Sequence, residues 1–244
     1  MSRVAAASAN GSTVRWHEVP DRATLRRTAL ERILSCSEKS IHERGAFHFV
    51  LAGGETPRAL YRELREAHAA WAAWHIWFGD ERCVPADDPA RNSRMAGESW
   101  LDNVAIPPGQ IHPIPAELGA QQGALSYAAS LQKVGDFDLV LLGLGEDGHT
   151  ASLFPGRDWG EKSGSPGALP VFDAPKPPPE RVTLSAARLS RAHEVLFLVD
   201  GEAKHRAVAA WRRGDSLPVR AIRPPHGVDV LLESTLLVPI SPAL

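Results

Sequence analysis

The chain has 244 residues, 43% hydrophobic and 23% charged, so it is long and apolar enough to bury a full-sized core. Its formal net charge of -2 gives no strong field that would attract nucleic acid or an anionic membrane. The two cysteines, Cys36 and Cys83, make no disulfide framework and fit a reducing compartment. No apolar run approaches membrane-spanning length, and residues 1–12 lack the apolar centre of a secretory signal. We therefore expect a frayed or disordered tail over 1–12 and a cytoplasmic protein.

Strands are expected to alternate with helices along the whole chain. Asp21 is placed to begin a helix that closes before Gly45, because apolar residues between them recur at helical spacing. The elements predicted in chain order are an edge strand over 13–20, this helix, a strand over 46–52, a helix from 57 to about 70, a strand over 74–79, a helix from 87 to 100, a helix over 116–134, a strand from 137, strands over 181–185 and 194–200, a helix over 204–211, and short strands over 217–222 and 228–232. This alternation predicts an α/β fold with a mostly parallel sheet and helices on both faces. Without a repeat or a linker, we expect one domain over 13–244.

The junction after the strand over 46–52 has the features of an anion site. The strand runs directly into Gly53-Gly54-Glu55-Thr56-Pro57, where we expect Thr56 to cap a helix and Pro57 to be its first residue. Two glycines and a helix N-terminus present free backbone N–H groups and a positive dipole end, which suit phosphate. A tight turn without a ligand explains the same residues, and both readings stay open here.

The stretch 137–156, FDLVLLGLGEDGHTASLFPG, is the one around which the chain is organised. Its apolar start shows no polar alternation, which is typical of a parallel strand buried on both faces. A glycine-rich turn over 143–148 then delivers His149. Open α/β sheets bind ligands at the carboxyl ends of their strands, so His149 is a candidate catalytic residue.

Two nucleotide-binding patterns are present in part. Residues 143–148 match G-x-G-x-x-G, but Pro155-Gly156 ends any following helix after about two turns, which argues against nicotinamide or flavin. Residues 156–163 nearly match a P-loop, but Glu161 separates the glycine from the lysine and no buried strand precedes the loop. The sequence also contains no His-Glu-x-x-His, Cys-x-x-Cys or G-x-S-x-G motif, so we predict no metal site and no serine nucleophile.

Four ends of the predicted strands carry polar groups, at 53–56, 80–82, 145–149 and, less clearly, Arg181. Each group alone has a structural explanation, such as an ion pair or a buried histidine that satisfies one hydrogen bond. In a parallel sheet the four can meet at one crevice. Together they indicate an anion-binding loop beside histidine and carboxylate groups, suited to acid–base chemistry on a small phosphorylated substrate. The residues alone leave the reaction type open.

The run 143–156 resembles the signature of 6-phosphogluconolactonases. Supporting blocks stand in the family's order: Gly-Gly-x-Thr-Pro at 53–57, Phe-Gly-Asp-Glu-Arg at 78–82 with Asn92, Ala-Pro-Lys-Pro-Pro-Pro-Glu-Arg-Val-Thr-Leu at 174–184, and Lys204. The resemblance implies a three-layer, Rossmann-like fold shared with glucosamine-6-phosphate deaminases and ribose-5-phosphate isomerases. It also implies hydrolysis of 6-phospho-D-glucono-1,5-lactone to 6-phosphogluconate in the oxidative pentose phosphate pathway, without a cofactor.

Roles follow from the chemistry of this ester and from the resemblance. Histidine side chains titrate near neutral pH, so His149 is the candidate to take the proton from water. Asp80 would orient the histidine or the water. Arg82 would stabilise charge at the carbonyl or hold the substrate, two roles that the sequence does not separate. Asp147 either tunes the imidazole or satisfies the glycine-rich turn, with a slight preference for the turn.

The phosphate would be held by Gly53, Gly54 and Thr56, with Arg181 and Lys204 as counter-charges in the positions that the resemblance suggests. Glu55 departs from the family's usual Ser or Thr, and because a carboxylate would repel phosphate we expect it to point outward.

Two other functions were weighed. The deaminase branch continues its Asp-Gly-His with Ile-Ala-Phe-Asn-Glu-Pro, whereas residues 150–155 here read TASLFP and lack that glutamate, which favours the lactonase. A sugar-phosphate sensor is the second, but no helix-turn-helix segment or basic extension is visible. The partner expected is thus a small sugar-phosphate lactone, with no nucleic acid or membrane, and the protein is a monomer or a small homo-oligomer.

Overall fold

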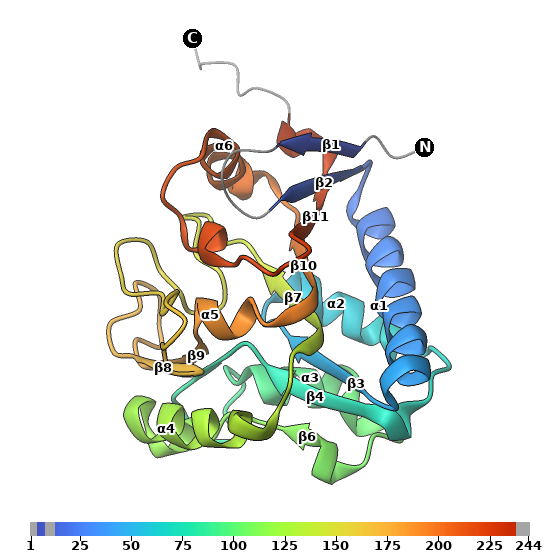
Figure 1. The fold of residues 1–244 in the computed structure, drawn as a ribbon, viewed down its shortest axis with the longest axis vertical. Coiled ribbons are helices and arrows are strands. Elements are labelled where there is room, and N and C mark those ends of the chain that lie inside the picture. Colours follow the sequence, from blue (N-terminus) through green and yellow to red (C-terminus); the bar gives the residue numbers. More distant parts are fainter. Residues whose placement is uncertain (1–3, 8–12, 238–244) are drawn as a thin grey trace.

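The computed structural model describes residues 4–7 and 13–237, which form a large central sheet, a small second sheet and flanking helices (Figure 1). In sheet order the eight strands of the large sheet are β1 (Val4–Ala7), β2 (Val14–Val19), β11 (Val228–Glu233), β10 (Ala192–Val199), β7 (Phe137–Gly143), β3 (Phe47–Leu51), β4 (Trp74–Phe78) and β6 (Ile111–His112). Every neighbouring pair is parallel except β1 and β2. The predicted mostly parallel sheet is therefore confirmed.

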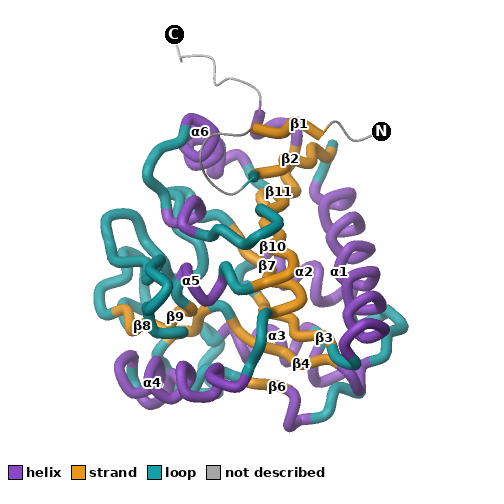
Figure 2. Tube along the Cα trace, viewed as in Figure 1, coloured by secondary structure: helices purple, strands orange, loops and turns teal. Residues whose placement is uncertain are grey.

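Helices cover both faces of this sheet. They are α1 (Arg22–Arg44), α2 (Glu55–Leu64) and α3 (Asn92–Ser99) on one face, and α4 (Ala120–Ser130), the short α5 (Ala186–Leu189) and α6 (His205–Arg213) toward the other (Figures 1 and 2). The alternation of side chains along β10 shows the two faces: Glu194 pairs with Arg32 of α1, whereas the Phe197 ring packs 4.9 Å from Trp211 of α6. The result is the predicted three-layer arrangement.

The central strand β7 is buried from Phe137 to Leu142, as its unbroken apolar sequence predicts. It lies between β3 and β10, with Val140 opposite both Val50 and Val195. This position carries the glycine-rich turn after β7 to the middle of the sheet's carboxyl edge.

The ends of α1 follow the predicted capping chemistry. The Asp21 side chain accepts a hydrogen bond from the Thr24 N–H at 2.7 Å, and Gly45 ends the helix with φ 79°, where a side chain would be strained. The start of α2 differs from prediction. Its N-cap is Gly54, with φ 105°, so Thr56 lies inside the first turn and Pro57 is the third helical residue.

Three further predictions need correction. The helix α2 ends at Leu64, well before residue 70, and α3 starts at Asn92 after the loop that was expected to begin it. The strand expected over 217–222 is a 3₁₀ helix, Pro218–Ala221, because Pro218 has no N–H to give to a strand ladder.

The small antiparallel sheet was not predicted. Its strands are β5 (Asp80–Arg82), β9 (Arg181–Leu184) and β8 (Ala168–Val171), in that order. The register pairs Arg82 with Arg181. Two strand ends far apart in sequence are thereby brought side by side.

The predicted tail over 1–12 lies mostly outside the described residues, as does 238–244 of the predicted domain. Within that tail, Val4–Ala7 form β1 and pair with β2, so β2 is not the edge strand that we expected. Over the residues described, the buried apolar side chains form one contiguous core. No helix in this part of the chain is long and apolar enough to cross a membrane.

Candidate active site

A cavity of about 340 Å³ opens at the carboxyl ends of β3, β4, β7 and β10. It contains groups from all four of the strand ends that the sequence singled out. The predicted site residues that line it are Gly53, Gly54, Thr56, Asp80, Arg82, His149, Arg181 and Lys204. Residues separated by up to 151 positions in the chain thus face one space, as expected for a parallel sheet.

His149 is held by the turn that precedes it. Gly148 takes φ 87°, its N–H donates to the Gly145 carbonyl, and the Gly145 N–H donates to the His149 carbonyl at 2.7 Å. The imidazole Nδ1 lies 2.5 Å from a carboxylate oxygen of Asp147, and the side chain is 19% exposed. It is therefore neither sealed from solvent nor free to rotate.

The partner of His149 defines its tautomer. A carboxylate accepts hydrogen bonds only, so the proton of the neutral imidazole lies on Nδ1. No described residue forms a hydrogen bond with Nε2, which leaves its lone pair available. Partial burial raises the pKa of Asp147, but the hydrogen bond from His149 and its charge outweigh this, and the pKa is lowered overall. The same Asp147 oxygen also accepts the backbone N–H of His149 at 3.2 Å, so Asp147 has a contact for each of the two roles expected of it, with the ring and with the turn.

The Asp80 carboxylate has hydrogen-bond partners other than His149. It is 6% exposed, and its two carboxylate oxygens accept hydrogen bonds from Ser152 Oγ at 2.6 Å and Asn92 Nδ2 at 3.1 Å. Within the described part of the chain no hydrogen bond joins Asp80 to His149. We expected Asp80 to orient either the histidine or the water. The observed hydrogen bonds do not support the first of these two roles.

The glycine loop before α2 is packed against this carboxylate network. A Cβ on Gly53 would lie 2.1 Å from the Asn92 side-chain oxygen, so only glycine allows the close approach. The first N–H groups of α2 have no partners within the helix and line the cavity with Gly53 and Gly54. The Thr56 hydroxyl donates to Asp200 at 2.5 Å, which ties α2 to the end of β10. Glu55 is 82% exposed and pairs with Arg58, which fits the expected outward orientation, although the residue is also among those that line the cavity.

Four basic side chains line the cavity, and the three that the sequence singled out differ in their contacts. Lys204 forms no hydrogen bond or ion pair with any described residue, and burial lowers its pKa. Arg82 donates from one terminal nitrogen to the Ala90 carbonyl at 2.6 Å, while its Nε is buried and, in the described structure, unpaired. Arg181 is 5% exposed and burial lowers its pKa.

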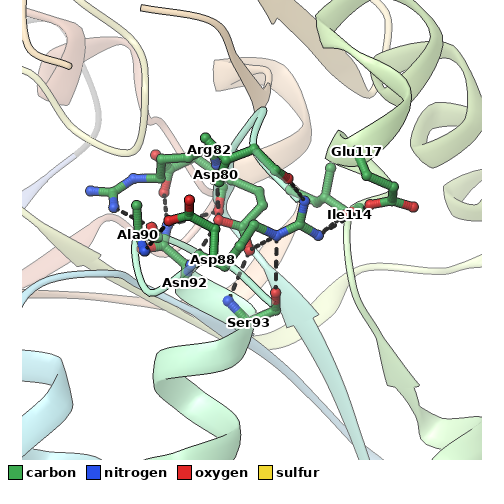
Figure 3. Close-up of polar contacts among 11 residues, drawn as sticks. Asp80, Arg82, Asp88, Ala90, Asn92, Ser93, Ile114 and Glu117 are labelled. Atoms are coloured by element: carbon green, nitrogen blue, oxygen red, sulfur yellow. Dashed lines mark hydrogen bonds and ion pairs between the residues drawn. The ribbon is translucent and has the colours of Figure 1, made fainter. Parts of the chain in front are cut away.

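A buried ion pair between Glu81 and Arg91 connects β5 with the residues before α3, and Figure 3 shows polar contacts of the neighbouring Asp80, Arg82, Asn92 and Ser93. Glu81 is fully buried and accepts backbone hydrogen bonds from Arg82, Asn92 and Ser93 at 2.7–2.8 Å. Arg91, 3% exposed, lies 3.3 Å from the same carboxylate. Burial raises the pKa of Glu81 despite these donors. This pair fixes the backbone on either side of Asp80 and at the start of α3.

Sequence reasoning missed two residues of the site. Ser152 lies within the 143–156 signature and links Asp80 to Arg181, which approaches its hydroxyl at 3.5 Å. Lys176 lies in the proline-rich segment and lines the cavity. Nothing in the spacing of either residue indicates a cavity, although both fall in blocks that carried the family resemblance. No group of three or more His, Cys, Asp or Glu side chains in the described structure could hold a metal ion.

Comparisons with known proteins agree with this fold. The family model described as glucosamine-6-phosphate isomerases/6-phosphogluconolactonase matches residues 20–231, so the chain belongs to this family. Within it, the chain groups with the 6-phosphogluconolactonases. It is 36% identical over 230 residues to the 6-phosphogluconolactonase of Mycobacterium leprae, covering 88% of this chain and 91% of that one. It is 38% identical over 226 residues to that of Synechocystis, covering 84% and 90%. The crystal structure of 6-phosphogluconolactonase from Thermotoga maritima has a TM-score of 0.84 at 28% identity, covering 91% of this chain and 100% of that one.

Proposed function

We propose that the protein hydrolyses 6-phospho-D-glucono-1,5-lactone to 6-phospho-D-gluconate, a step of the oxidative pentose phosphate pathway, with His149 as the general base. One observation carries the proposal: His149, whose imidazole is held by Asp147, and the N-terminus of α2 line the same cavity. Hydrolysis of a phosphorylated ester requires a general base and an anion-binding site, here the N–H groups at the start of α2, in the same cavity. The names of the relatives support the same activity.

The reaction needs one proton to be taken and one returned. Nε2 of neutral His149 removes a proton from a water molecule whose oxygen attacks the C1 carbonyl of the lactone. The resulting tetrahedral intermediate collapses with cleavage of the bond between C1 and the ring oxygen. The imidazolium returns the proton to that oxygen, which becomes the 5-hydroxyl, and the new acid ionises. Asp147 stabilises the imidazolium between the two transfers.

The remaining polar groups have separate tasks in this proposal. Arg82 stabilises the negative charge that develops on the carbonyl oxygen, since one terminal nitrogen is anchored on Ala90 and the side chain lines the cavity. The N–H groups at Gly53 and Gly54 and the unpaired Lys204 bind the phosphate. Asp80 acts as a positioning residue, because its oxygens are bonded to Asn92 and Ser152.

A coupled assay tests the activity. Freshly prepared lactone is supplied, the formation of 6-phosphogluconate is followed, and the spontaneous hydrolysis measured without protein is subtracted. We expect a rate above this background that is proportional to protein concentration. Glucosamine 6-phosphate is assayed in parallel for release of ammonia, and we expect none. Ammonia release without lactone hydrolysis would refute the proposal and favour the deaminase.

A further inference from the structure

The segment 174–179, Ala-Pro-Lys-Pro-Pro-Pro, forms a closed loop beside the cavity, here called the proline strap. The Ala174 N–H donates to the Pro179 carbonyl at 2.9 Å and closes it at the base. Four of its six residues are prolines and have no N–H, so the strap cannot be held by a strand ladder. Its inner carbonyl groups need donors from elsewhere.

Arg181 supplies those donors. Its Nε donates to the Pro178 carbonyl at 3.1 Å, and one terminal nitrogen donates to the carbonyls of Lys176 at 2.8 Å and Pro177 at 3.4 Å. The other terminal nitrogen is 3.5 Å from Ser152 Oγ. Every nitrogen of this buried guanidinium is thus engaged within the protein, which leaves little of it to bind a phosphate directly.

The strap carries one charged side chain, Lys176. This side chain is exposed, lines the cavity, and forms no hydrogen bond or ion pair with a described residue. Lys204 lies close enough for the two ammonium groups to repel each other. The cavity therefore has two neighbouring cations, neither of which forms an ion pair with a described residue, although Lys204 is also attracted by Glu146, Asp147 and Asp200. A ligand with a doubly charged phosphate would relieve this repulsion.

We propose that Lys176 is a further substrate-binding residue that engages the phosphate together with Lys204, and that Arg181 acts through it, as a positioning residue that holds the proline strap. The choice of ligand rests on the proposed function. Arg181 then holds the proline strap in place and is not a direct counter-charge to the phosphate.

The test is the affinity for 6-phosphogluconate, measured by titration calorimetry, with gluconate as the ligand that lacks phosphate. For Lys176→Met we expect Kd to rise about fivefold, which corresponds to an exposed charge pair. KM for the lactone should rise similarly with kcat unchanged. The difference from the wild type should shrink in high salt, because exposed charges are screened. The matched control is Lys162→Met, an exposed lysine outside the cavity lining, which should change nothing.

Arg181→Lys keeps the charge but cannot reach all three carbonyls. If Arg181 acts through Lys176, the double variant Lys176→Met/Arg181→Lys will bind 6-phosphogluconate no more weakly than Arg181→Lys alone, within about twofold. If the increases in Kd of the two single variants multiply in the double variant, Arg181 contacts the ligand directly. That result would contradict its role as a positioning residue. An unchanged Kd in Lys176→Met would overturn the whole inference. Because Lys176 is exposed, this variant should fold and gives a result even if Arg181→Lys does not fold. Wild-type protein that binds 6-phosphogluconate without lactonase activity would instead contradict only the proposed function.

Discussion

Gly145 lies so close to the imidazole of His149 that a Cβ atom on residue 145 would come within 2.0 Å of Nδ1. Unbonded carbon and nitrogen atoms cannot approach to this distance. Only glycine at this position therefore leaves the ring where it meets Asp147 and faces the cavity. The glycine-rich turn thus serves to place a histidine. Its glycines match the dinucleotide-binding pattern for this reason and not because they bind a nucleotide.

Gly145→Ala should displace the imidazole and lower kcat about 100-fold, the cost of misplacing a catalytic group by roughly 1 Å. The backbone of residue 145 does not need glycine, since its φ lies outside the left-handed region, so the melting temperature should change little. Gly164→Ala is the matched control, because a Cβ there meets nothing within 4 Å. Equal activity of the two variants would contradict this role.

Asp147→Asn should also lower kcat, by about 100-fold or more, with little change in KM. The asparagine amide can donate to Nδ1, which would favour the tautomer with its proton on Nε2 and remove the base. Steady-state kinetics on the lactone measure the effect. A fall in affinity for 6-phosphogluconate with unchanged kcat would show instead that Asp147 supports the turn alone.

The sequence predicts the elements whose signals are local. Asp21 and Gly45 bound α1 because capping depends on a few neighbouring atoms. The unbroken apolar run of β7 identified the central strand, and the polar residues after four strands identified the cavity, since parallel strands share one carboxyl edge.

Signals that depend on distant partners were missed. Thr56 is a residue type that often caps helices, but Gly54 is the N-cap of α2. The Thr56 hydroxyl instead donates to Asp200, 144 positions away. The small sheet pairs β5 with β9, about 100 residues apart, and no local pattern marks that pairing. The choice between Asp80 and Asp147 as the partner of His149 likewise required the folded turn.

Glu81→Gln tests the ion pair below the site. The change leaves Arg91 with the partly exposed Glu117 as its remaining carboxylate, and breaking a buried pair costs up to about 3–5 kcal/mol of unfolding free energy. Chemical denaturation measures the loss. Glu98→Gln removes an exposed partner, that of Arg94, and should cost less than about 1 kcal/mol. Similar values for the two variants would mean that the buried pair contributes no more than a surface one.

Three histidines at the edge of the sheet make stability sensitive to acid. The rings of His48 and His75 stack 4.6 Å apart, and His112 stacks 3.9 Å from Trp77 and contacts His75. Burial, followed by repulsion from His75 and His48, lowers the pKa of His112 to about 4. Because the folded pKa lies below the ordinary value of 6.5, the folded state favours neutral His112. The contribution of neutral His112 to the free energy of unfolding is then fully present above pH 6.5 and is lost as the pH falls toward 4.

His112→Phe keeps a ring on Trp77 but has no proton to bind. Between pH 7.5 and pH 5 the wild type should lose on the order of 1 kcal/mol more unfolding free energy than this variant, allowing for solvent screening at a half-buried site. Urea unfolding at both pH values measures the difference. The exposed His42→Gln serves as the control and should follow the wild type. Parallel losses in all three proteins would remove His112 as the cause.

The imidazole of His149 and the N-terminus of α2 line one cavity, and the proposed reaction depends on this arrangement. Its most direct test is the turnover of 6-phosphogluconolactone by His149→Ala, corrected for spontaneous hydrolysis, beside the affinity of the same variant for 6-phosphogluconate. We expect kcat to fall at least about 1,000-fold, while Kd stays within a few-fold of the wild type, because the ring is the base and the phosphate is bound elsewhere. Near-normal turnover in this variant would contradict the account.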